Sequence, residues 1–350
     1  MGRLVRLRTW YVGFFTINGH LGFLALFYVL CTVPARGQGP ALLVLPLAAL
    51  AFNWVFQSYM FLVNDLFDMP FDRMAGKRLE LEGFPRWAVY LTLAFLILAG
   101  LLIGLTANLK VALLVIIAYL LATAYSAPGI RLKSRRVWGF LCDSFMERPL
   151  PVLIIFALFR WISAEAIVFV ILCGTLHPDM NHELMDYQDD VRSNTHTLAT
   201  QLGKPRSEFL MRHLFYPLNI ASIALLSVLV VTRVTSTLLG MTAAWLFVIL
   251  VAGLVYLSRP LNSEVVTRTF QRFANLARTL YHSGMISFPI YYANVNFEGL
   301  ITMVVALTLV SRNFLYLPLL VLFVISQYHY SGFYKILLRH FLDTGRSVFH

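Results

Sequence analysis

The chain has 350 residues, of which 59% are hydrophobic and 13% are charged, and its mean hydropathy is +0.73. These values exclude an ordinary soluble domain and indicate an integral, multi-pass membrane protein embedded in a lipid bilayer. The formal net charge is +11, but most basic residues flank apolar stretches and no stacking or basic-helix motif accompanies them, which argues against nucleic-acid binding.

Apolar stretches of membrane length follow one another along the whole chain. A helix needs about 20 apolar residues to cross a bilayer, and such stretches lie near residues 10–32, 41–63, 86–107, 109–126, 138–159, 164–185, 209–232, 237–257, 288–311 and 314–337. The stretch at 288–311 is the weakest, so we expect about nine or ten spans. The predicted fold is an all-α, polytopic transmembrane helical bundle, with residues 1–350 forming a single membrane domain.

The distribution of Lys and Arg predicts the orientation of the bundle. Basic residues concentrate near both termini and in four loops, near 64–86, 126–137, 186–208 and 258–287, whereas the intervening connections carry few. By the positive-inside rule, both termini and these loops are predicted to face the cytoplasm.

Two acidic motifs follow membrane-length apolar stretches. The first contains Asn64, Asp65, Asp68 and Asp72, and the second contains Glu183, Asp186 and Asp190. In each, three carboxylates occupy relative positions 0, 3 and 7, which fall within roughly a 60° arc of one helix face. Like charges so close together repel unless a cation is present. Because Mg²⁺ prefers oxygen ligands, both motifs are predicted to bind Mg²⁺.

The repetition of the motif predicts the overall plan of the bundle. Four apolar spans separate the two copies, which indicates two related halves with the motifs facing each other across a central cavity. Pro70 lies inside the first motif, and proline interrupts helices. We therefore expect Asp72 to lie on a turn beyond the end of the helix.

Basic residues near the motifs are predicted to bind a diphosphate and to stabilise it as a leaving group. They are Lys77 and Arg78 after the first motif, Arg131 and Lys133 in the next loop, and Arg192 after the second motif. Tyr125 begins the loop that contains Arg131. Its hydroxyl either orients the diphosphate or anchors the preceding span at the membrane interface.

Asp143 and Glu147 lie four residues apart near the start of the fifth predicted span. Ionisable residues at membrane depth are candidates for function, and these two form a candidate acceptor pocket. The alternatives are a structural pair between Glu147 and Arg148, or a position near the membrane interface.

These motifs resemble those of the UbiA superfamily of intramembrane prenyltransferases. The first motif matches the family's Asn-Asp-x-x-Asp-x-x-x-Asp pattern in full, and the second matches at Asp186 and Asp190, with Glu183 replacing the usual Asp. The segment 197–203 is similar to the family's Thr-Leu-Ala-x-x-Leu-Gly tail. The resemblance covers roughly residues 10–260, whereas residues 261–350 contain C-terminal spans whose role it does not indicate.

The resemblance implies that Mg²⁺ at both motifs holds an isoprenyl diphosphate, which ionises to an allylic cation that a hydrophobic or aromatic acceptor captures. It implies catalytic roles for Asn64, Asp68 and Asp186. The chain departs from the family pattern after Lys77 and at His196, where a Lys is usual. These departures leave the acceptor class open.

Two other functions compete with prenyl transfer to an aromatic or lipid acceptor. A membrane terpene cyclase would perform the same ionisation but capture the cation within the substrate. A cation-coupled transporter would use the two acidic half-sites of an internal repeat. The carboxylates, however, lie at the ends of predicted spans rather than at mid-membrane depth.

Overall fold

The computed structural model describes residues 21–33, 42–77, 79, 81–176, 180–234 and 288–328. Within these ranges the chain is built from helices and their connections, with no β-strand. The helices are α2 (Phe23–Thr32), α3 (Val44–Ala75), α4 (Arg86–Ala107), α5 (Leu109–Ser126), α6 (Val137–Glu147), α7 (Pro149–Leu158), α8 (Ala164–Thr175), α9 (Met180–Met185), α10 (Tyr187–Arg192), α11 (Leu198–Leu202), α12 (Lys204–Leu210), α13 (Tyr216–Val234), α17 (Phe288–Arg312) and α18 (Leu317–Tyr328).

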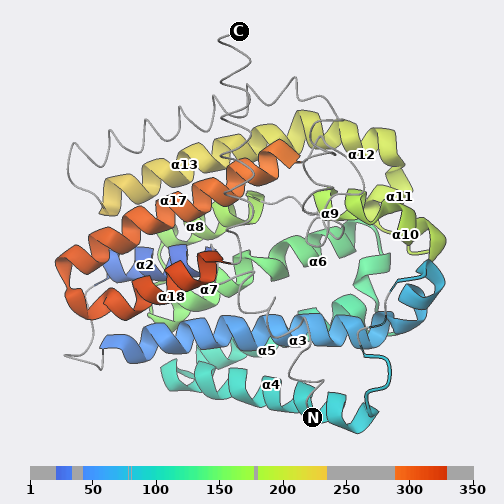
Figure 1. The fold of residues 1–350 in the computed structure, drawn as a ribbon, viewed down its shortest axis with the longest axis horizontal. Helices are drawn as coiled ribbons and strands as arrows, with labels where there is room; N and C mark the ends of the chain where they lie inside the picture. The colour runs from blue at the N-terminus through green and yellow to red at the C-terminus, as the bar shows by residue number, and fades with distance from the viewer. Residues whose placement is uncertain are drawn as a thin grey trace.

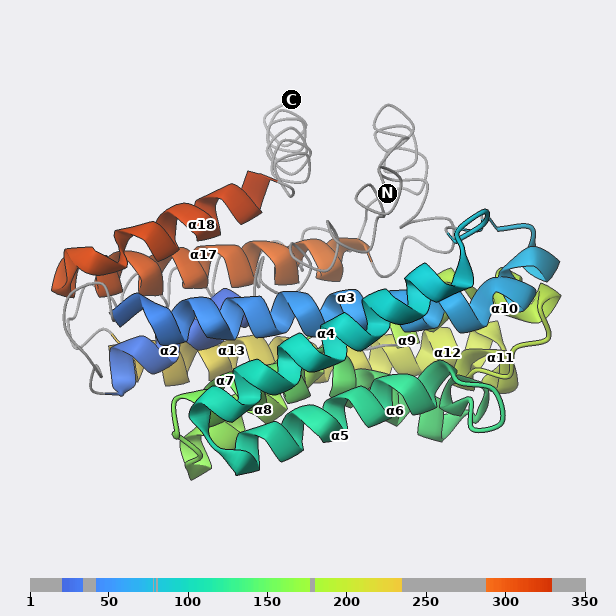
Figure 2. The same cartoon turned by 90° about the horizontal axis from the view of Figure 1, so that it is seen from below.

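The long helices run roughly parallel or antiparallel to one another in an elongated bundle (Figure 1, Figure 2). Helix α3 packs against α4 and α5, and α2 packs against α7, α13 and α17. The short helix α7 contacts α2, α3, α5, α6 and α8, so it lies inside the bundle. The short helices α9 to α12 lie at one end, beside the end of α3.

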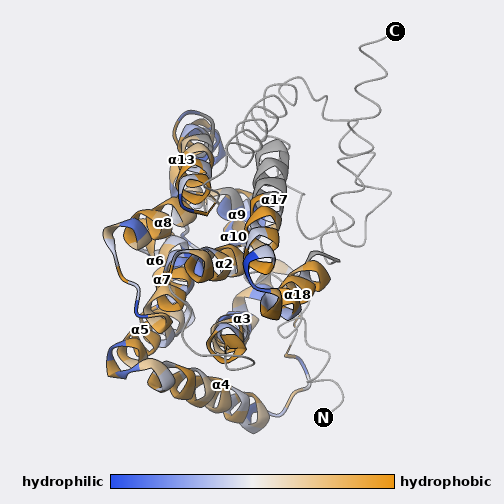
Figure 3. Ribbon diagram, turned by 90° about the vertical axis from the view of Figure 1, so that its left-hand side faces the viewer, coloured by the Kyte–Doolittle hydropathy of each residue, from blue (hydrophilic) through white to orange (hydrophobic). Residues whose placement is uncertain are grey.

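Many large apolar side chains of the described helices are exposed on the outside of the bundle, as expected for contact with lipid. Within the described ranges, four helices are long and apolar enough to cross a membrane: Val44–Ala75, Arg86–Ala107, Leu109–Ser126 and Lys204–Val234. Large side chains of α4, including Trp87, Leu91 and Phe95, point outward and are exposed, and the hydrophobic colouring extends over the outer helices (Figure 3). Burying such side chains in lipid replaces unfavourable contact with water.

The structure confirms the predicted boundaries at 86–107 and 109–126, which are α4 and α5. The stretch predicted as one span at 138–159 is occupied by two helices, α6 and α7, with a break at Arg148. Proline disfavours a helical conformation in the residue before it, and Pro149 follows this break. The stretch predicted at 164–185 contains α8 and α9, and residues 177–179 between them lie outside the described residues. The span at 237–257 and both termini lie outside the described residues.

The expectation that Asp72 lies beyond a helix end is wrong, because α3 continues through Pro70 to Ala75. The helix ends instead at Gly76, whose φ of 74° is in the left-handed region that glycine adopts readily. The Gly76 N–H donates to the carbonyl of Arg73, and the Lys77 N–H donates to that of Asp72 at 2.8 Å. This paired arrangement reverses the chain and brings Lys77 back toward the last turn of α3.

Candidate functional site

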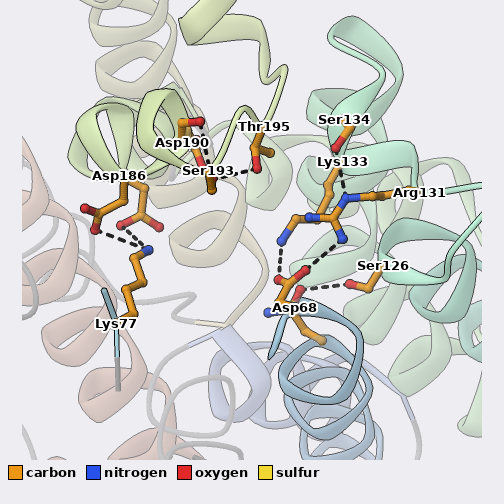
Figure 4. A network of polar contacts seen from close by, with 12 residues as sticks. Asp68, Lys77, Ser126, Arg131, Lys133, Ser134, Asp186, Asp190, Ser193 and Thr195 are labelled. Carbon is orange, nitrogen blue, oxygen red and sulfur yellow. Dashed lines mark hydrogen bonds and ion pairs between the residues drawn. The ribbon is translucent and has the colours of Figure 1, made fainter. Parts of the chain in front are cut away.

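The first acidic motif lies on the last turns of α3, next to the loop that follows α5. Asp68 is only 4% exposed. Its Oδ1 accepts a hydrogen bond from Nη1 of Arg131 at 3.0 Å, and its Oδ2 pairs with Lys133. Asn64, one turn earlier, accepts a hydrogen bond from Ser126 at 2.8 Å. The structure therefore brings Asp68 together with Arg131 and Lys133, two of the predicted diphosphate-binding residues (Figure 4).

The loop that holds Arg131 and Lys133 is tightly organised. Arg131 has a φ of 37° and precedes a 3₁₀ turn, η4 (Leu132–Ser134). Its Nε donates to Ser134 at 3.0 Å, and its guanidinium lies 3.5 Å from the ring centroid of Phe71. The Nη2 of Arg131 is buried and has no hydrogen-bond partner among the described residues. This buried donor is suited to an anionic oxygen.

The second acidic motif occupies α9 and α10. Met180 and Leu184 of α9 pack with Ala199 and Met211 in a small apolar cluster, which anchors the motif beside α11. Asp186, directly before α10, is exposed. The Nζ of Lys77 lies 3.5 Å from Oδ1 of Asp186 (Figure 4).

Lys77 connects the two motifs electrostatically. Its Nζ also lies 3.4 Å from Oδ2 of Asp189. Burial lowers the pKa of Lys77, but Asp186, Asp189, Asp72 and Asp190 outweigh burial and raise it. One cation from the end of α3 thus faces carboxylates from both motifs.

Asp190 is a partly buried carboxylate of this group whose pKa is raised. Burial, reinforced by repulsion from Asp186, raises its pKa to about 7, against the opposing effects of Lys133, Lys77 and a hydrogen bond with Thr197. Lys133 also pairs with Asp68, and α10 contacts α3, so the second motif lies close to the first. The arrangement concentrates negative charge that a divalent cation would neutralise.

Glu183 makes a contact that differs from those of the other acidic residues. Its Oε2 accepts the backbone N–H of Ala199 at 2.7 Å, in the first turn of α11. The N-terminus of a helix has unpaired N–H groups that favour a carboxylate. Glu183 therefore ties the second motif to the Thr-Leu-Ala tail that follows it.

The donor set fits Mg²⁺ in chemical type, because the carboxylates are hard oxygen ligands. Within the described ranges, however, no three acidic, His or Cys side chains converge on a common point as a preformed metal site. Asp68 and Asp186 are instead paired with Lys and Arg side chains. Asp65 also lies on α3, and Asp72 is close enough to Asp186 for repulsion between them.

The remaining predicted site residues are Tyr125, Arg192 and Arg78. Tyr125 donates a hydrogen bond to Asp143, whose electrostatic neighbours include Lys133 and Glu147. Arg192 is largely exposed, and its Nη1 lies 3.5 Å from Oδ1 of Asp189. Arg78 lies outside the described residues.

Sequence reasoning missed three contributors to the site: Phe71, Ser126 and Asp189. Asp189 belongs to the second acidic run but does not fit the 0, 3, 7 spacing, and only its position beside Lys77 distinguishes it. Ser126 directly follows Tyr125, and Phe71 lies between two motif positions. Neither carries a charge pattern that would have identified it.

Comparison with solved structures supports the same architecture. A UbiA homologue from Archaeoglobus fulgidus bound to DMAPP and Mg²⁺ is 14% identical, with a TM-score of 0.52 over 85% of this chain and 98% of that chain. The same homologue bound to GPP and Mg²⁺ aligns at 17% identity, with a TM-score of 0.50 over 84% and 98%. At these identities the likeness shows the fold alone.

The sequence itself was also compared with curated proteins and with models of protein families. No match was found among curated proteins. The model of the UbiA prenyltransferase family matches residues 21–279, which include both acidic motifs and the tail after the second. This match covers more than half of the sequence, and the chain therefore belongs to the UbiA prenyltransferase family.

Proposed function

We propose that this protein is a Mg²⁺-dependent intramembrane prenyltransferase that ionises an isoprenyl diphosphate and transfers the prenyl group to an aromatic or lipid acceptor. The observation that carries this proposal is that Lys77, directly after the helix of the first motif, pairs with Asp186 of the second motif, while Arg131 and Lys133 lie beside Asp68. The A. fulgidus homologue, whose structures contain Mg²⁺ with DMAPP or GPP, supports it.

In this function, Asp68 and Asp72 of α3 would hold Mg²⁺ together with Asp186 and Asp190. Bound Mg²⁺ would supply Lewis-acid stabilisation of the diphosphate as it departs. Glu183 and Asp65 remain further candidate ligands.

The basic residues would bind the diphosphate directly. Arg131, Lys133 and Lys77 would exchange their carboxylate partners for diphosphate oxygens, and the buried Nη2 of Arg131 supplies a donor for such an oxygen. Asn64, held by Ser126, would keep a fixed amide beside the reacting end of the substrate. These preorganised donors would stabilise the charge that develops when the carbon–oxygen bond breaks.

Diphosphate release from geranyl, farnesyl and geranylgeranyl diphosphates, measured with purified protein and Mg²⁺, tests this function. Asp68→Asn and Asp186→Asn should each lower the rate of prenyl transfer by at least about 100-fold, because each removes charge that stabilises the transition state. Glu82→Gln is the matched control, because Glu82 is exposed in the loop after α3. Full activity in both Asp variants would refute the proposal.

The products separate this function from its alternatives. Release of diphosphate that depends on an added acceptor, with a prenylated product, supports transfer. Release without an acceptor, with a cyclised hydrocarbon or alcohol, would instead assign the protein as a terpene cyclase. Cation-dependent uptake into vesicles without any diphosphate release would assign a transporter.

A further inference from the structure

A second group of polar side chains lies deeper in the bundle than the acidic motifs. It centres on the break between α6 and α7, where Arg148 has φ −132° and ψ −55°. The Nη1 of Arg148 lies 2.9 Å from Oε2 of Glu147, and each side chain is 14% exposed. Because α7 is surrounded by α2, α3, α5 and α8, this ion pair lies inside the bundle.

Charged and hydrogen-bonding groups connect this ion pair with the diphosphate site. Asp143 lies one turn before Glu147 on α6, accepts a hydrogen bond from Tyr125, and has Glu147 and Lys133 as electrostatic neighbours. Lys133 is itself paired with Asp68. A row of polar groups thus leads from Asp68 through Asp143 to Glu147.

Helix α3 places two further polar side chains, Asn53 and Gln57, beside this row. The Nε2 of Gln57 donates to the backbone carbonyl of Glu147 at 3.5 Å. Its Oε1 and both amide atoms of Asn53 are fully buried, with no hydrogen-bond partner among the described residues. At 100° per residue, Asn53 and Gln57 lie within roughly 60° of Asn64 and Asp68, on one face of α3. The polar face of α3 therefore continues from the acidic motif into the core.

Unpaired amide groups in an apolar core lower the stability of the folded protein, so their presence calls for an explanation. Burying such a group without a partner costs roughly 1 to 3 kcal/mol, so most buried amides in native proteins are paired. Asn53 and Gln57 offer both donors and acceptors. A ligand bearing hydroxyl or carbonyl groups could satisfy them, whereas an alkyl chain could not.

Resting on the proposed function, we propose that Asn53, Gln57, Asp143 and Glu147 bind the polar part of the acceptor, and that this acceptor is uncharged. Of the cations beside these two carboxylates, Arg148 is paired with Glu147 and Lys133 with Asp68, so an acceptor carboxylate would be brought out of water beside Asp143 and Glu147. Neutral hydroxyl, amide or carbonyl groups match both the carboxylates and the side-chain amides.

Two pairs of isosteric probes test the acceptor charge directly: 4-hydroxybenzamide against 4-hydroxybenzoate, and oleamide against oleate. Their affinities would be measured by calorimetry with wild-type protein holding Mg²⁺ and geranylgeranyl thiolodiphosphate. In at least one pair, the neutral probe should bind at least about tenfold more tightly than its anionic partner. Equal affinity, tighter binding of both anions, or no binding of any probe would overturn the proposal.

Variants separate recognition from folding. The pair of probes that wild-type protein distinguishes is then measured with the double variant Asp143→Asn, Glu147→Gln. This variant should bind the anionic probe of that pair at least about tenfold more tightly than wild type, because the repulsion between the two carboxylates and the anion is removed. Asn53→Leu should weaken binding of the neutral probe without lowering Tm, because it replaces an unpaired buried amide with an apolar group. A lower Tm with unchanged probe affinities in Asn53→Leu would show a structural role and overturn the inference.

The same samples distinguish this inference from the function on which it rests. Binding of geranylgeranyl thiolodiphosphate and Mg²⁺ is measured first, before any acceptor probe is added. If wild-type protein does not bind the thiolodiphosphate, the proposed function fails. If it binds normally but does not distinguish the probes by charge, only the acceptor inference fails.

Discussion

Arg131 illustrates how one side chain can combine several contacts at this site. Its guanidinium pairs with Asp68 at 3.0 Å, donates to Ser134 at 3.0 Å and stacks on Phe71 at 3.5 Å. A planar guanidinium can do all three at once, whereas the ammonium group of Lys is a compact point charge. Asp68 and the loop after α5 are therefore held in one arrangement by the shape of Arg131 as well as by its charge.

Arg131→Lys should lower the rate of diphosphate release by at least about tenfold and the free energy of unfolding by about 1 to 2 kcal/mol, because the contacts with Ser134 and Phe71 are lost. The measurement compares initial rates with Tm in detergent. Arg73→Lys serves as the control, since Arg73 is exposed near the end of α3. Wild-type rates in Arg131→Lys would show that the positive charge alone is sufficient.

At the scale of elements, close packing places the basic loop against α6. Gly139 lies in the first turns of α6, and a Cβ at this position would lie 2.6 Å from the carbonyl oxygen of Leu132 and 2.8 Å from Cα of Lys133. Both are backbone atoms of η4, which cannot move aside as a flexible side chain would. The position of Lys133 beside Asp68 therefore depends on the absence of a side chain on α6.

Gly139→Ala should displace η4 and lower the rate of diphosphate release by at least about tenfold, because a shift of about 1 Å in a catalytic group has effects of this size. Overpacking should also lower the free energy of unfolding by about 1 to 3 kcal/mol. Initial rates and denaturation curves would be compared with those of Leu141→Ala, which shortens an outward-facing side chain of α6. Unchanged kinetics in Gly139→Ala would mean that η4 adjusts without moving Lys133.

At the scale of the whole molecule, the acidic motifs bring together two regions that are distant in the sequence. Helix α10 contacts α3, and Lys77 is the cation between them. Anything that neutralises this group of carboxylates should hold the two regions together. Mg²⁺ is expected to do so more strongly than a single ammonium group, because it carries two charges and binds several oxygens.

Mg²⁺ should raise Tm, and EDTA should reverse the increase, because ligands that bind the folded state stabilise it by about 2.7 kcal/mol at 100 times Kd. Lys77→Gln should have a lower Tm without metal and a larger increase on Mg²⁺ addition, since its carboxylates lack their cation. Differential scanning fluorimetry would compare this variant with Lys204→Gln, whose side chain is exposed. An equal Mg²⁺ response in wild type and Lys77→Gln would place the metal elsewhere.

Local sequence patterns were sufficient to predict much of this protein. Composition indicated a membrane protein, and hydropathy placed α4 and α5 at the boundaries the structure confirms. The acidic spacing and the resemblance built on it led to the family that the match over residues 21–279 establishes. These features can be predicted from the sequence because helical periodicity and span length depend only on neighbouring residues. The number of spans, the division into two halves and the orientation remain predictions.

Contacts between distant segments were decided only by the tertiary structure. Asp68 and Arg131 are 63 residues apart, and no spacing rule predicts that they pair. Arg148 interrupts a stretch that hydropathy read as continuous, because apolar content does not record the conformational effect of Pro149. The contact between Glu183 and Ala199, and the position of Lys77 between the motifs, likewise depend on how α3, α10 and α11 pack. The physical reason is that sequence patterns specify local geometry, whereas packing selects which distant side chains meet.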